Sequence, residues 1–169
     1  MAKTKQLIIL VGNIGSGKST LARKYIEKRY VAIARDYIRY AIGEGKYIFN
    51  PNYESIIWEI EQYMFTRFMD LGVNIVVDEV GVSRRMRKAY IPYAQIKKYK
   101  IIALVLPRYT QEEAVNNRMK DPHGQNNRLL WESVWDKFNA IYTEPTKAEG
   151  FNEIKFLTKR YMNRIANEN

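Results

Sequence analysis

Short apolar runs recur along the chain, and between them apolar residues are spaced as in helices. Runs of this length, bounded by glycine, proline or polar residues, predict buried β-strands. We therefore expect strands at 7–11, 30–34, 73–77, 100–106 and 153–157. The last of these is predicted from its alternation of apolar and polar residues.

The intervening segments predict helices at 18–29, 53–71, 83–99, 111–119 and 129–142, with a further helix after 158. Pro92 lies inside 83–99, where proline kinks or divides a helix. The six basic residues of that segment are expected mostly in solvent. Side chains expected to pack in the core are Leu21, Tyr25 and Ile26 in the first helix, and Ile56, Ile57, Ile60, Met64, Phe65 and Phe68 in the second.

Alternating strands and helices predict an α/β fold, and the sequence G-N-I-G-S-G-K-S-T at 12–20, between the first strand and the first helix, indicates the P-loop NTPase type. We expect a parallel sheet of about five strands, with helices on both faces and right-handed crossovers. The helix, polar loop and helix at about 110–140 predict a mobile helical lid, with an ordinary helical hairpin as the alternative. The length of 169 residues fits one domain, 1–169.

Composition narrows the possible chemistry. A hydrophobic content of 46% is enough for a sizeable core. Without cysteine there are no disulfides or thiolate sites, and the single histidine, His123, cannot form a histidine metal site alone. Every apolar run is shorter than a membrane span, so we expect a cytoplasmic protein that does not cross a membrane.

The chain is strongly basic, with 28 lysines and arginines against 18 aspartates and glutamates and a net charge of +10. Such a charge attracts polyanions and phosphorylated small molecules alike. A well-solvated basic surface without a charged partner is the alternative.

A glycine-rich loop joins the first strand to the first helix and matches G-x-x-x-x-G-K-[ST]. Its backbone N–H groups are expected to wrap the phosphates of ATP or another nucleoside triphosphate. Lys18 is expected to neutralise the terminal phosphates, and Ser19 to hold Mg²⁺ through its hydroxyl. A glycine-rich turn that binds nothing is the alternative. The predicted nucleotide-binding residues are Gly12, Asn13, Ile14, Gly15, Ser16, Gly17, Lys18, Ser19 and Thr20.

Two carboxylates follow expected strands at the edge where ligands bind in open α/β sheets. Asp78 is a candidate second Mg²⁺ ligand, or else a cap of the next element. Asp36 can accept a proton from an acceptor hydroxyl, and Arg39 can bind a phosphate with its planar guanidinium. An ion pair between these two residues at the start of a helix is the alternative.

The sequence resembles the phosphate-loop polynucleotide 5′-kinases of bacteriophages and of DNA and RNA repair enzymes. Four segments carry the resemblance: G-x-x-G-S-G-K-S-T at 12–20, R-D-x-x-R at 35–39, N-N-R at 116–118 and E-P-T-x-A-E-G-F at 144–151. The resemblance implies that Asp36 is the general base and that Arg39 binds the phosphate of the acceptor. It also implies a catalytic lid arginine, Arg118 or Arg128, with Lys120 as a further candidate.

One departure from the family pattern concerns the third expected strand. Family members often continue it into an Asp-x-x-Asn-like stretch, whereas this chain reads Asp78-Glu79-Val80-Gly81 and lacks the asparagine. This difference leaves the acceptor and the lid roles open.

Together, these features predict an ATP-dependent kinase that transfers the γ-phosphoryl group to the 5′-OH end of DNA or RNA. A kinase for a nucleoside, nucleotide or sugar shares the same loop and base and is the first alternative. A nucleotide-dependent binding protein without phosphotransfer is the second. The oligomeric state stays open. For a polynucleotide acceptor, the predicted base-stacking side chains, which alternatively pack in the core or a loop, are Tyr37, Tyr40, Tyr47 and Phe49.

Overall fold

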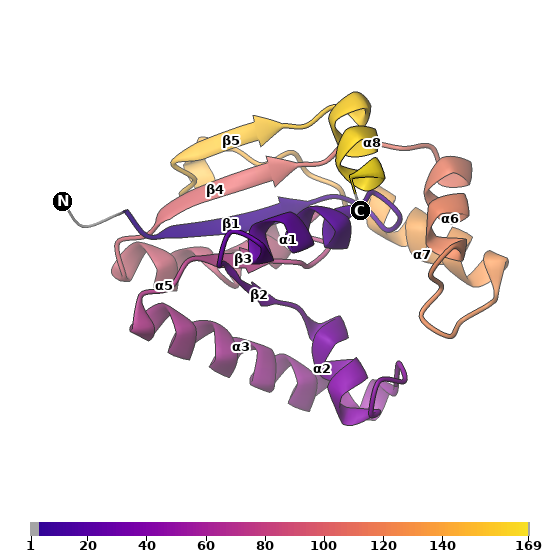
Figure 1. The fold of residues 1–169 in the computed structure, drawn as a ribbon, viewed down its shortest axis with the longest axis horizontal. Helices are drawn as coiled ribbons and strands as arrows, with labels where there is room; N and C mark the ends of the chain where they lie inside the picture. Colours follow the sequence, from indigo (N-terminus) through magenta and orange to yellow (C-terminus); the bar gives the residue numbers. More distant parts are fainter. Residues whose placement is uncertain (1–3, 169) are drawn as a thin grey trace.

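The computed structural model describes residues 4–168, which form a five-stranded, all-parallel sheet with helices on both faces (Figure 1). The predicted span 1–169 includes residues 1–3 and 169, which lie outside the described part. In spatial order the strands are β2 (Val31–Ile33), β3 (Ile75–Val77), β1 (Gln6–Val11), β4 (Lys100–Val105) and β5 (Glu153–Phe156). The α/β class and the parallel sheet of five strands are therefore confirmed.

Strand β1 lies at the centre of the sheet, because it pairs in parallel with both β3 and β4. Its residues Leu7–Val11 are all buried, as expected for an apolar strand covered on both faces. Since all strands run in the same direction, their carboxyl ends meet at one edge. The glycine-rich loop after β1 and Asp78 after β3 both lie at this edge.

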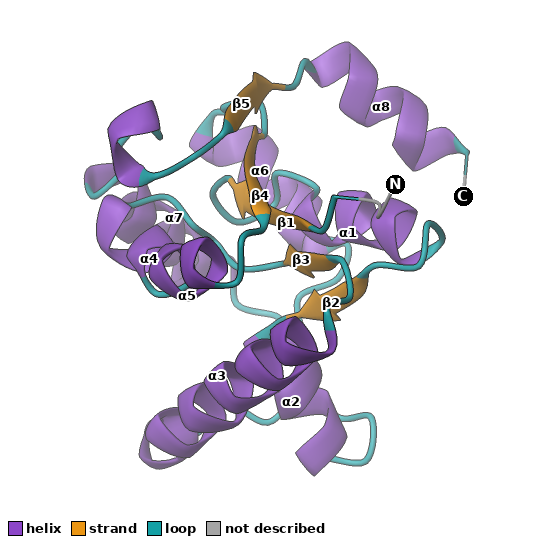
Figure 2. Ribbon diagram, turned by 90° about the vertical axis from the view of Figure 1, so that its left-hand side faces the viewer, coloured by secondary structure: helices purple, strands orange, loops and turns teal. Residues whose placement is uncertain are grey.

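Helices cover the two faces of the sheet separately (Figure 2). On one face, α3 (Glu54–Leu71) and α5 (Ile91–Ile96) pack through Phe65, Met69, Ile91 and Ala94. On the other face, α1 (Lys18–Ile26) and α8 (Lys159–Asn167) pack through Leu21, Ala22, Met162 and Ile165. Alternate residues of β1 enter the two cores: Leu7, Ile9 and Val11 on the first side, Ile8 and Leu10 on the second.

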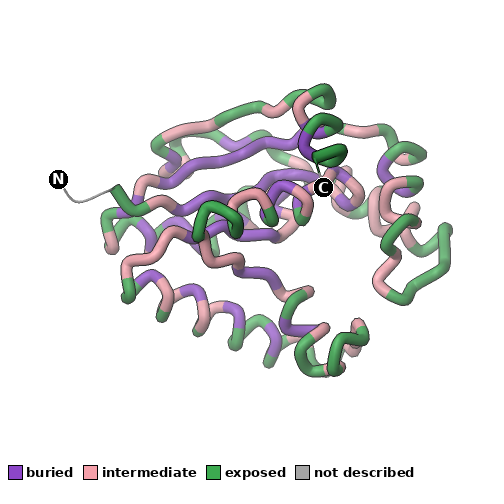
Figure 3. The backbone as a smooth tube through the Cα atoms, viewed as in Figure 1, coloured by how far each residue is buried: buried purple, intermediate pink, exposed green. Residues whose placement is uncertain are grey.

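The remaining helices lie mostly around the carboxyl edge. Helix α2 (Arg35–Ile42) follows β2, and α6 (Gln111–Met119) and α7 (Arg128–Ala140) project beyond the sheet as a helical pair (Figure 1). The loop at the tip of this pair is largely exposed (Figure 3). Short helical turns occur at α4 (Arg84–Lys88), η1 (Pro51–Tyr53) and η2 (Lys147–Glu149). Within the described chain, every helix is too short or too polar to cross a bilayer.

Two helical segments differ from the sequence prediction. Helix α2 was not predicted, because its eight residues are too few to show a clear period. The segment 83–99 forms two short helices, α4 and α5, with Pro92 in the first turn of α5. Proline is tolerated there because the first N–H groups of a helix have no intrahelical partner.

Most of the six basic residues of 83–99 face solvent, as expected, but Arg87 is an exception and is fully buried. Its Nη2 lies 2.7 Å from Oε1 of Glu149, and its Nη1 donates to the carbonyl oxygens of Gly81 and Thr143. Breaking such a buried pair costs about 3–5 kcal/mol, because it leaves one charge uncompensated. The E-G-F segment at 149–151 therefore ties the end of the chain to the core.

The apolar stripe of α3 was also predicted too broadly. Ile57 and Phe65 are buried, whereas Ile56 is 56% exposed and Ile60 is 37% exposed. The buried positions follow i, i+4 spacing and include Glu61, whose Oε1 accepts from the Tyr90 hydroxyl at 2.5 Å. Burial raises the pKa of Glu61 to about 7.

Helix α3 lies beside β2, at the edge of the sheet (Figure 1). Only a narrow face of the helix therefore meets the core. The prediction for Ile26 was also wrong, since its side chain is 44% exposed. Ile26 is the last residue of α1.

Candidate functional site

The glycine-rich loop curves around the N-terminus of α1. Gly15 and Gly17 adopt the left-handed φ values 63° and 91°, which suit glycine. The Ser16 hydroxyl donates to the carbonyl oxygen of Asn13 at 2.8 Å, and the N–H of Gly12 bonds to Val80 at 3.1 Å. The loop is thus fixed by its own contacts, with the N-terminus of α1 directed at the space it surrounds.

Helices α6 and α7 both form hydrogen bonds with this loop. The Asn117 side chain donates to the Gly15 carbonyl at 3.1 Å, and the Asn13 side chain donates to the Trp135 carbonyl at 2.9 Å. A Cβ atom at Gly15 would lie 1.9 Å from the backbone oxygen of Ala114, so only glycine allows α6 to approach this closely. Asn117 of the N-N-R segment therefore supports the phosphate loop.

Lys18, Ser19 and Asp78 form the polar floor of the loop. The Lys18 ammonium donates to the Asn13 carbonyl at 2.6 Å, and the Ser19 hydroxyl is close enough to the Asp78 carboxylate to lower its pKa. Burial lowers the pKa of Lys18 to about 8; the Asp78 carboxylate opposes that shift and the Arg118 guanidinium adds to it. Burial raises the pKa of Asp78, whose Oδ2 also accepts from the Tyr37 hydroxyl at 3.1 Å. Positive charge placed here would therefore stabilise the Asp78 carboxylate.

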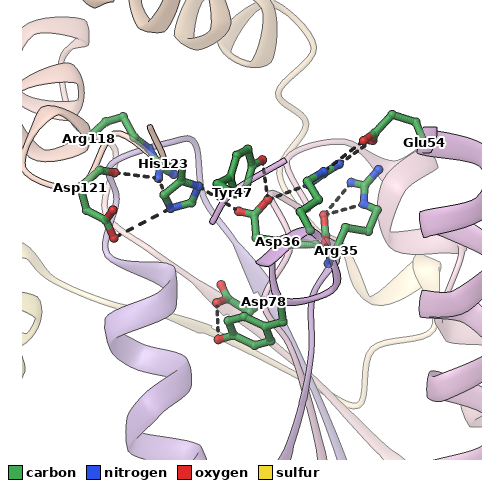
Figure 4. A network of polar contacts seen from close by, with 11 residues as sticks. Arg35, Asp36, Tyr47, Glu54, Asp78, Arg118, Asp121 and His123 are labelled. Atoms are coloured by element: carbon green, nitrogen blue, oxygen red, sulfur yellow. Dashed lines mark hydrogen bonds and ion pairs between the residues drawn. The ribbon is translucent and has the colours of Figure 1, made fainter. Parts of the chain in front are cut away.

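Asp36 stands in the first turn of α2, and its two carboxylate oxygens have different surroundings (Figure 4). Oδ1 accepts from Arg39 Nη1 at 2.6 Å and from the Tyr47 hydroxyl at 2.9 Å. Oδ2 lies 3.6 Å from Nδ1 of His123, which is longer than a hydrogen bond. Oδ2 is consequently the oxygen with capacity for a further donor.

Arg39 is buried, and its guanidinium contacts two carboxylates. Besides Asp36, it binds both oxygens of Glu54, through Nε at 3.1 Å and Nη2 at 2.5 Å. The ion pair between Asp36 and Arg39 that sequence reasoning kept as an alternative is thus present. It uses only one oxygen of Asp36, so it is compatible with a further role for that carboxylate.

The loop between α6 and α7 contacts the surroundings of Asp36 through His123. The imidazole packs against the rings of Tyr47 and Tyr40, with centroid distances of 4.8 Å and 5.7 Å. Its Nε2 lies 2.9 Å from Nη1 of Arg118, whose guanidinium is 4.9 Å from the Trp131 ring. Arg118 therefore stands between the phosphate-loop lysine, whose pKa it lowers, and the corner occupied by Asp36.

A cavity of about 1220 Å³ joins these groups. It is lined by Lys18, Ser19, Asp36, Arg39, Asp78 and Arg118, which come from the phosphate loop, α1, α2, the end of β3 and the lid. Arg128 is not among the lining residues: its Nε contacts Glu132 at 2.9 Å and its Nη1 donates to Asn116 at 2.8 Å. Residues 14–20 of the predicted phosphate loop line the cavity as well, so the structure brings these predicted residues together and places Arg128 elsewhere on the pair of helices α6 and α7.

Sequence reasoning missed three residues at this site, namely Glu54, Glu79 and His123. Glu79 binds Arg35 through both Nε and Nη2, and it accepts from the Arg35 backbone N–H at 2.7 Å. The sole histidine could have been noticed in the lid loop, but nothing in the sequence places it beside Asp36, which lies on a different element. Glu54 opens α3 and shows no motif at all.

The α/β fold of this chain is shared with known proteins. The family described as AAA domain matches residues 7–145. The chain belongs to the AAA domain family. Its P-loop NTPase fold is thereby confirmed, and with it the binding of a nucleoside triphosphate at the loop. No curated protein matches the sequence.

Solved structures of this family fold include kinases with different acceptors. A chain of the Pnkp1/Rnl/Hen1 complex is 28% identical with a TM-score of 0.54; the match covers 69% of this chain and 40% of that one. A fungal RNA kinase is 15% identical with a TM-score of 0.62, covering 93% and 77%. The APS kinase CysC of Mycobacterium tuberculosis, solved with AMPPNP and APS, is 13% identical with a TM-score of 0.59, covering 98% and 95%.

These matches differ in what they imply. The chain spans less than half of the Pnkp1/Rnl/Hen1 chain. The likenesses to the RNA kinase and the APS kinase are likenesses of fold alone. The family match therefore shows a P-loop NTPase fold, while a reaction and an acceptor have to be argued from the chemistry of the site.

Proposed function

We propose that the chain is an ATP-dependent kinase that transfers the γ-phosphoryl group to the 5′-OH end of DNA or RNA. One observation carries the proposal: Lys18 and Asp36 line the same cavity of about 1220 Å³. Pockets for one drug-sized ligand are about 300–1,000 Å³, so this cavity has room for a nucleotide and an acceptor together. A binding protein without phosphotransfer would have no use for a carboxylate on the acceptor side.

Asp36 acts in this proposal as the general base. Its Oδ1 is held by Arg39 and Tyr47, which leaves Oδ2 to accept the proton of the attacking hydroxyl. The hydroxyl oxygen forms its bond to the γ-phosphorus as the bond from that phosphorus to the bridging oxygen of ATP breaks. Arg39 is proposed to bind the acceptor phosphate, which requires it to release part of its contact with Glu54.

Lys18 and Arg118 stabilise the charge that develops on the transferred group. Ser19 and Asp78 fit a Mg²⁺ ion: both offer oxygen, and burial raises the pKa of Asp78 although the Lys18 ammonium opposes that shift, so further positive charge would stabilise the carboxylate. The described residues contain no cluster of three or more metal-ligating side chains, and Mg²⁺ in such sites takes few protein ligands in addition to phosphates. When bound, the ion would bridge and neutralise the phosphates.

The helical pair at about 110–140 is proposed to be the lid of one kinase domain, 1–169. Its contacts to the glycine-rich loop, through Asn117 and Asn13, support the hinge side of such a lid. Its tip contacts α2 through His123. Closure over the nucleotide would exclude water, which otherwise accepts the phosphoryl group.

Arg118 is the proposed catalytic lid arginine, and we expect Arg118→Ala to lower kcat by about 10²–10³-fold. The reason is its position between Lys18 and the acceptor corner. The matched control is Arg128→Ala on the same lid, expected to stay within a few-fold of wild type because Arg128 contacts Glu132 and Asn116 instead. Single-turnover transfer rates of the two variants decide the assignment. The reverse order of effects would make Arg128 the catalytic residue.

A polynucleotide acceptor is favoured over a small molecule by cations at the cavity. Arg23, Lys120 and Lys137 line it and form no ion pair within the described residues. Phe49 lines it too and is 55% exposed; the Arg39 guanidinium lies 5.7 Å from its ring centroid, and its exposed part is proposed for base stacking. Tyr37, Tyr40 and Tyr47 are instead engaged with Asp78, His123 and Asp36.

Acceptor length tests this choice. Lengthening a 5′-OH oligonucleotide from one nucleotide to several should raise kcat/KM, because phosphates beyond the reacting nucleotide reach further cations. Added salt should weaken the longer acceptor more than the shorter one, since counterion release scales with the phosphates contacted. The measurement is a series of kcat/KM values against length and salt. A nucleoside used as efficiently as an oligomer, with equal salt dependence, would establish the small-molecule kinase instead.

A further inference from the structure

His123 joins two parts of the site that the proposed mechanism treats separately. It belongs to the lid loop, yet its ring packs on Tyr40 and Tyr47, and its side chain is only 12% exposed. Its two ring nitrogens face different groups: Nδ1 faces Asp36, and Nε2 lies 2.9 Å from Nη1 of Arg118, with the carboxylate of Asp121 beyond hydrogen-bond distance at 3.9 Å (Figure 4). The residue therefore links the lid arginine with the proposed base.

The polarity of these contacts fixes the protonation of the ring. A guanidinium only donates hydrogen bonds, so the 2.9 Å contact from Arg118 Nη1 requires Nε2 to be an acceptor. A neutral imidazole that accepts at Nε2 carries its proton on Nδ1. That proton faces Oδ2 of Asp36, the oxygen assigned to the acceptor hydroxyl, at 3.6 Å between the heavy atoms.

We propose that His123 is a positioning residue for phosphoryl transfer: as a neutral Nδ1–H imidazole it holds Arg118 through Nε2 and faces Asp36 through Nδ1. The lid arginine and the base are thereby set in one geometry when the lid is closed. This role rests on the kinase function proposed above. Nε of Arg118 is buried without a partner among the described residues, so the guanidinium depends on the contacts of Nη1 and on Trp131 for its orientation.

Charged and titratable groups face His123 from three sides. Asp36, Arg39 and Tyr40 belong to α2, Tyr47 follows that helix, and Arg118 and Asp121 belong to the lid. Burial lowers the pKa of His123; Arg118 and Arg39 add to that shift, while Asp36 and Asp121 oppose it. The ring is thus neutral at neutral pH. Protonation, below the ordinary histidine pKa of about 6.5, removes the acceptor at Nε2 and repels Arg118.

Because the chain has one histidine, the imidazole can be observed without assignment. We expect long-range ¹H–¹⁵N correlation spectra of the full chain at about pH 8 to show the Nδ1–H tautomer. Free neutral histidine prefers the Nε2–H form, and the unfolded protein supplies that reference. Arg118→Ala should raise the pKa of His123, whereas the matched Arg128→Ala should leave it unchanged.

Kinetics test the positioning role itself. We expect His123→Ala to lower kcat by about 10–100-fold, as for a misplaced catalytic group, with little change in the KM for ATP. His123→Gln should recover part of this loss, because its amide oxygen can accept from Arg118 in place of Nε2. Wild-type kcat should fall as His123 becomes protonated near the ordinary histidine pKa of about 6.5, and the fall in this pH range should be absent in His123→Gln. A merely structural role would lower the unfolding temperature of His123→Ala without moving that pH profile.

The outcomes separate this inference from the proposed function. An Nε2–H tautomer, an unchanged kcat in His123→Ala, or a fall near pH 6.5 that persists in His123→Gln overturns the role of His123 alone. An absence of transfer by the wild-type protein to every acceptor overturns the kinase proposal, and the spectra still report the contact between Arg118 and His123 independently of activity.

Discussion

Replacing Asp36 by asparagine is expected to lower kcat by about 10²–10⁴-fold, the usual contribution of a general base. Asparagine keeps the size of the side chain and an oxygen for Arg39 and Tyr47, but it cannot take up the proton of the acceptor hydroxyl. The affinity for ATP should stay nearly unchanged, because Asp36 lies on the acceptor side of the cavity. Single-turnover transfer with saturating acceptor measures the chemical step directly.

Glu54→Gln is the matched control for this variant. Glu54 is the other carboxylate bound to Arg39, so its neutralisation disturbs the ion pair and leaves the proposed base in place. We expect a much smaller loss of kcat, within about tenfold, as for an ordinary hydrogen-bonded charge pair. Equal losses in the two variants would show that Asp36 serves only to compensate Arg39. Transfer by Asp36→Asn at the wild-type rate would refute the general-base assignment.

Lys18→Ala is the second large expected effect, with a fall in kcat of about 10²–10³-fold and weaker ATP binding. The ammonium lies inside the phosphate loop, bonded to the Asn13 carbonyl, and no other lysine occupies that position. Its removal deletes the positive charge that meets the terminal phosphates. Transfer assays together with calorimetric ATP titration separate the loss of binding from the loss of chemistry.

Lys24→Ala provides the comparison within the same helix. Lys24 is on α1, pairs with Glu27 at 3.8 Å and does not line the cavity. The Lys24→Ala substitution removes one positive charge from the protein, as Lys18→Ala does. It should leave both ATP binding and transfer near wild type. Because Lys18 is buried, the unfolding temperatures of both variants are needed to show that the fold is kept. Similar activity losses in both would mean that general charge, and not the loop lysine, supports catalysis.

Much of the fold could be predicted because the signals were local. The apolar runs of β1 and β4 are buried on both faces, so nearly every residue is hydrophobic and the strands are unmistakable. The conformation of the glycine-rich loop could be predicted because its glycines tolerate a left-handed φ. Thr110 and Glu113 form a capping box at the start of α6, which is likewise a local pattern of the sequence.

What could not be predicted depends on contacts between distant elements. Arg87 and Glu149 are far apart in the chain, and no periodicity indicates that this basic residue is buried by its partner. Ile56 and Ile60 look like core residues, but α3 packs at the edge of the sheet and exposes them. His123 lies beside Asp36 because the loop between α6 and α7 packs against α2. The candidate site was therefore predicted as a set of residues, and its geometry came from the structure.

The most direct test of the central claim is transfer of labelled γ-phosphate from ATP to a panel of acceptors: 5′-OH DNA and RNA oligonucleotides, nucleosides, nucleotides and sugars. Asp36→Asn and Glu54→Gln serve as the matched pair in the same assay. The account predicts label on the 5′ end of oligonucleotides, lost in Asp36→Asn and kept in Glu54→Gln. Label confined to small molecules, or no label on any acceptor, would contradict it.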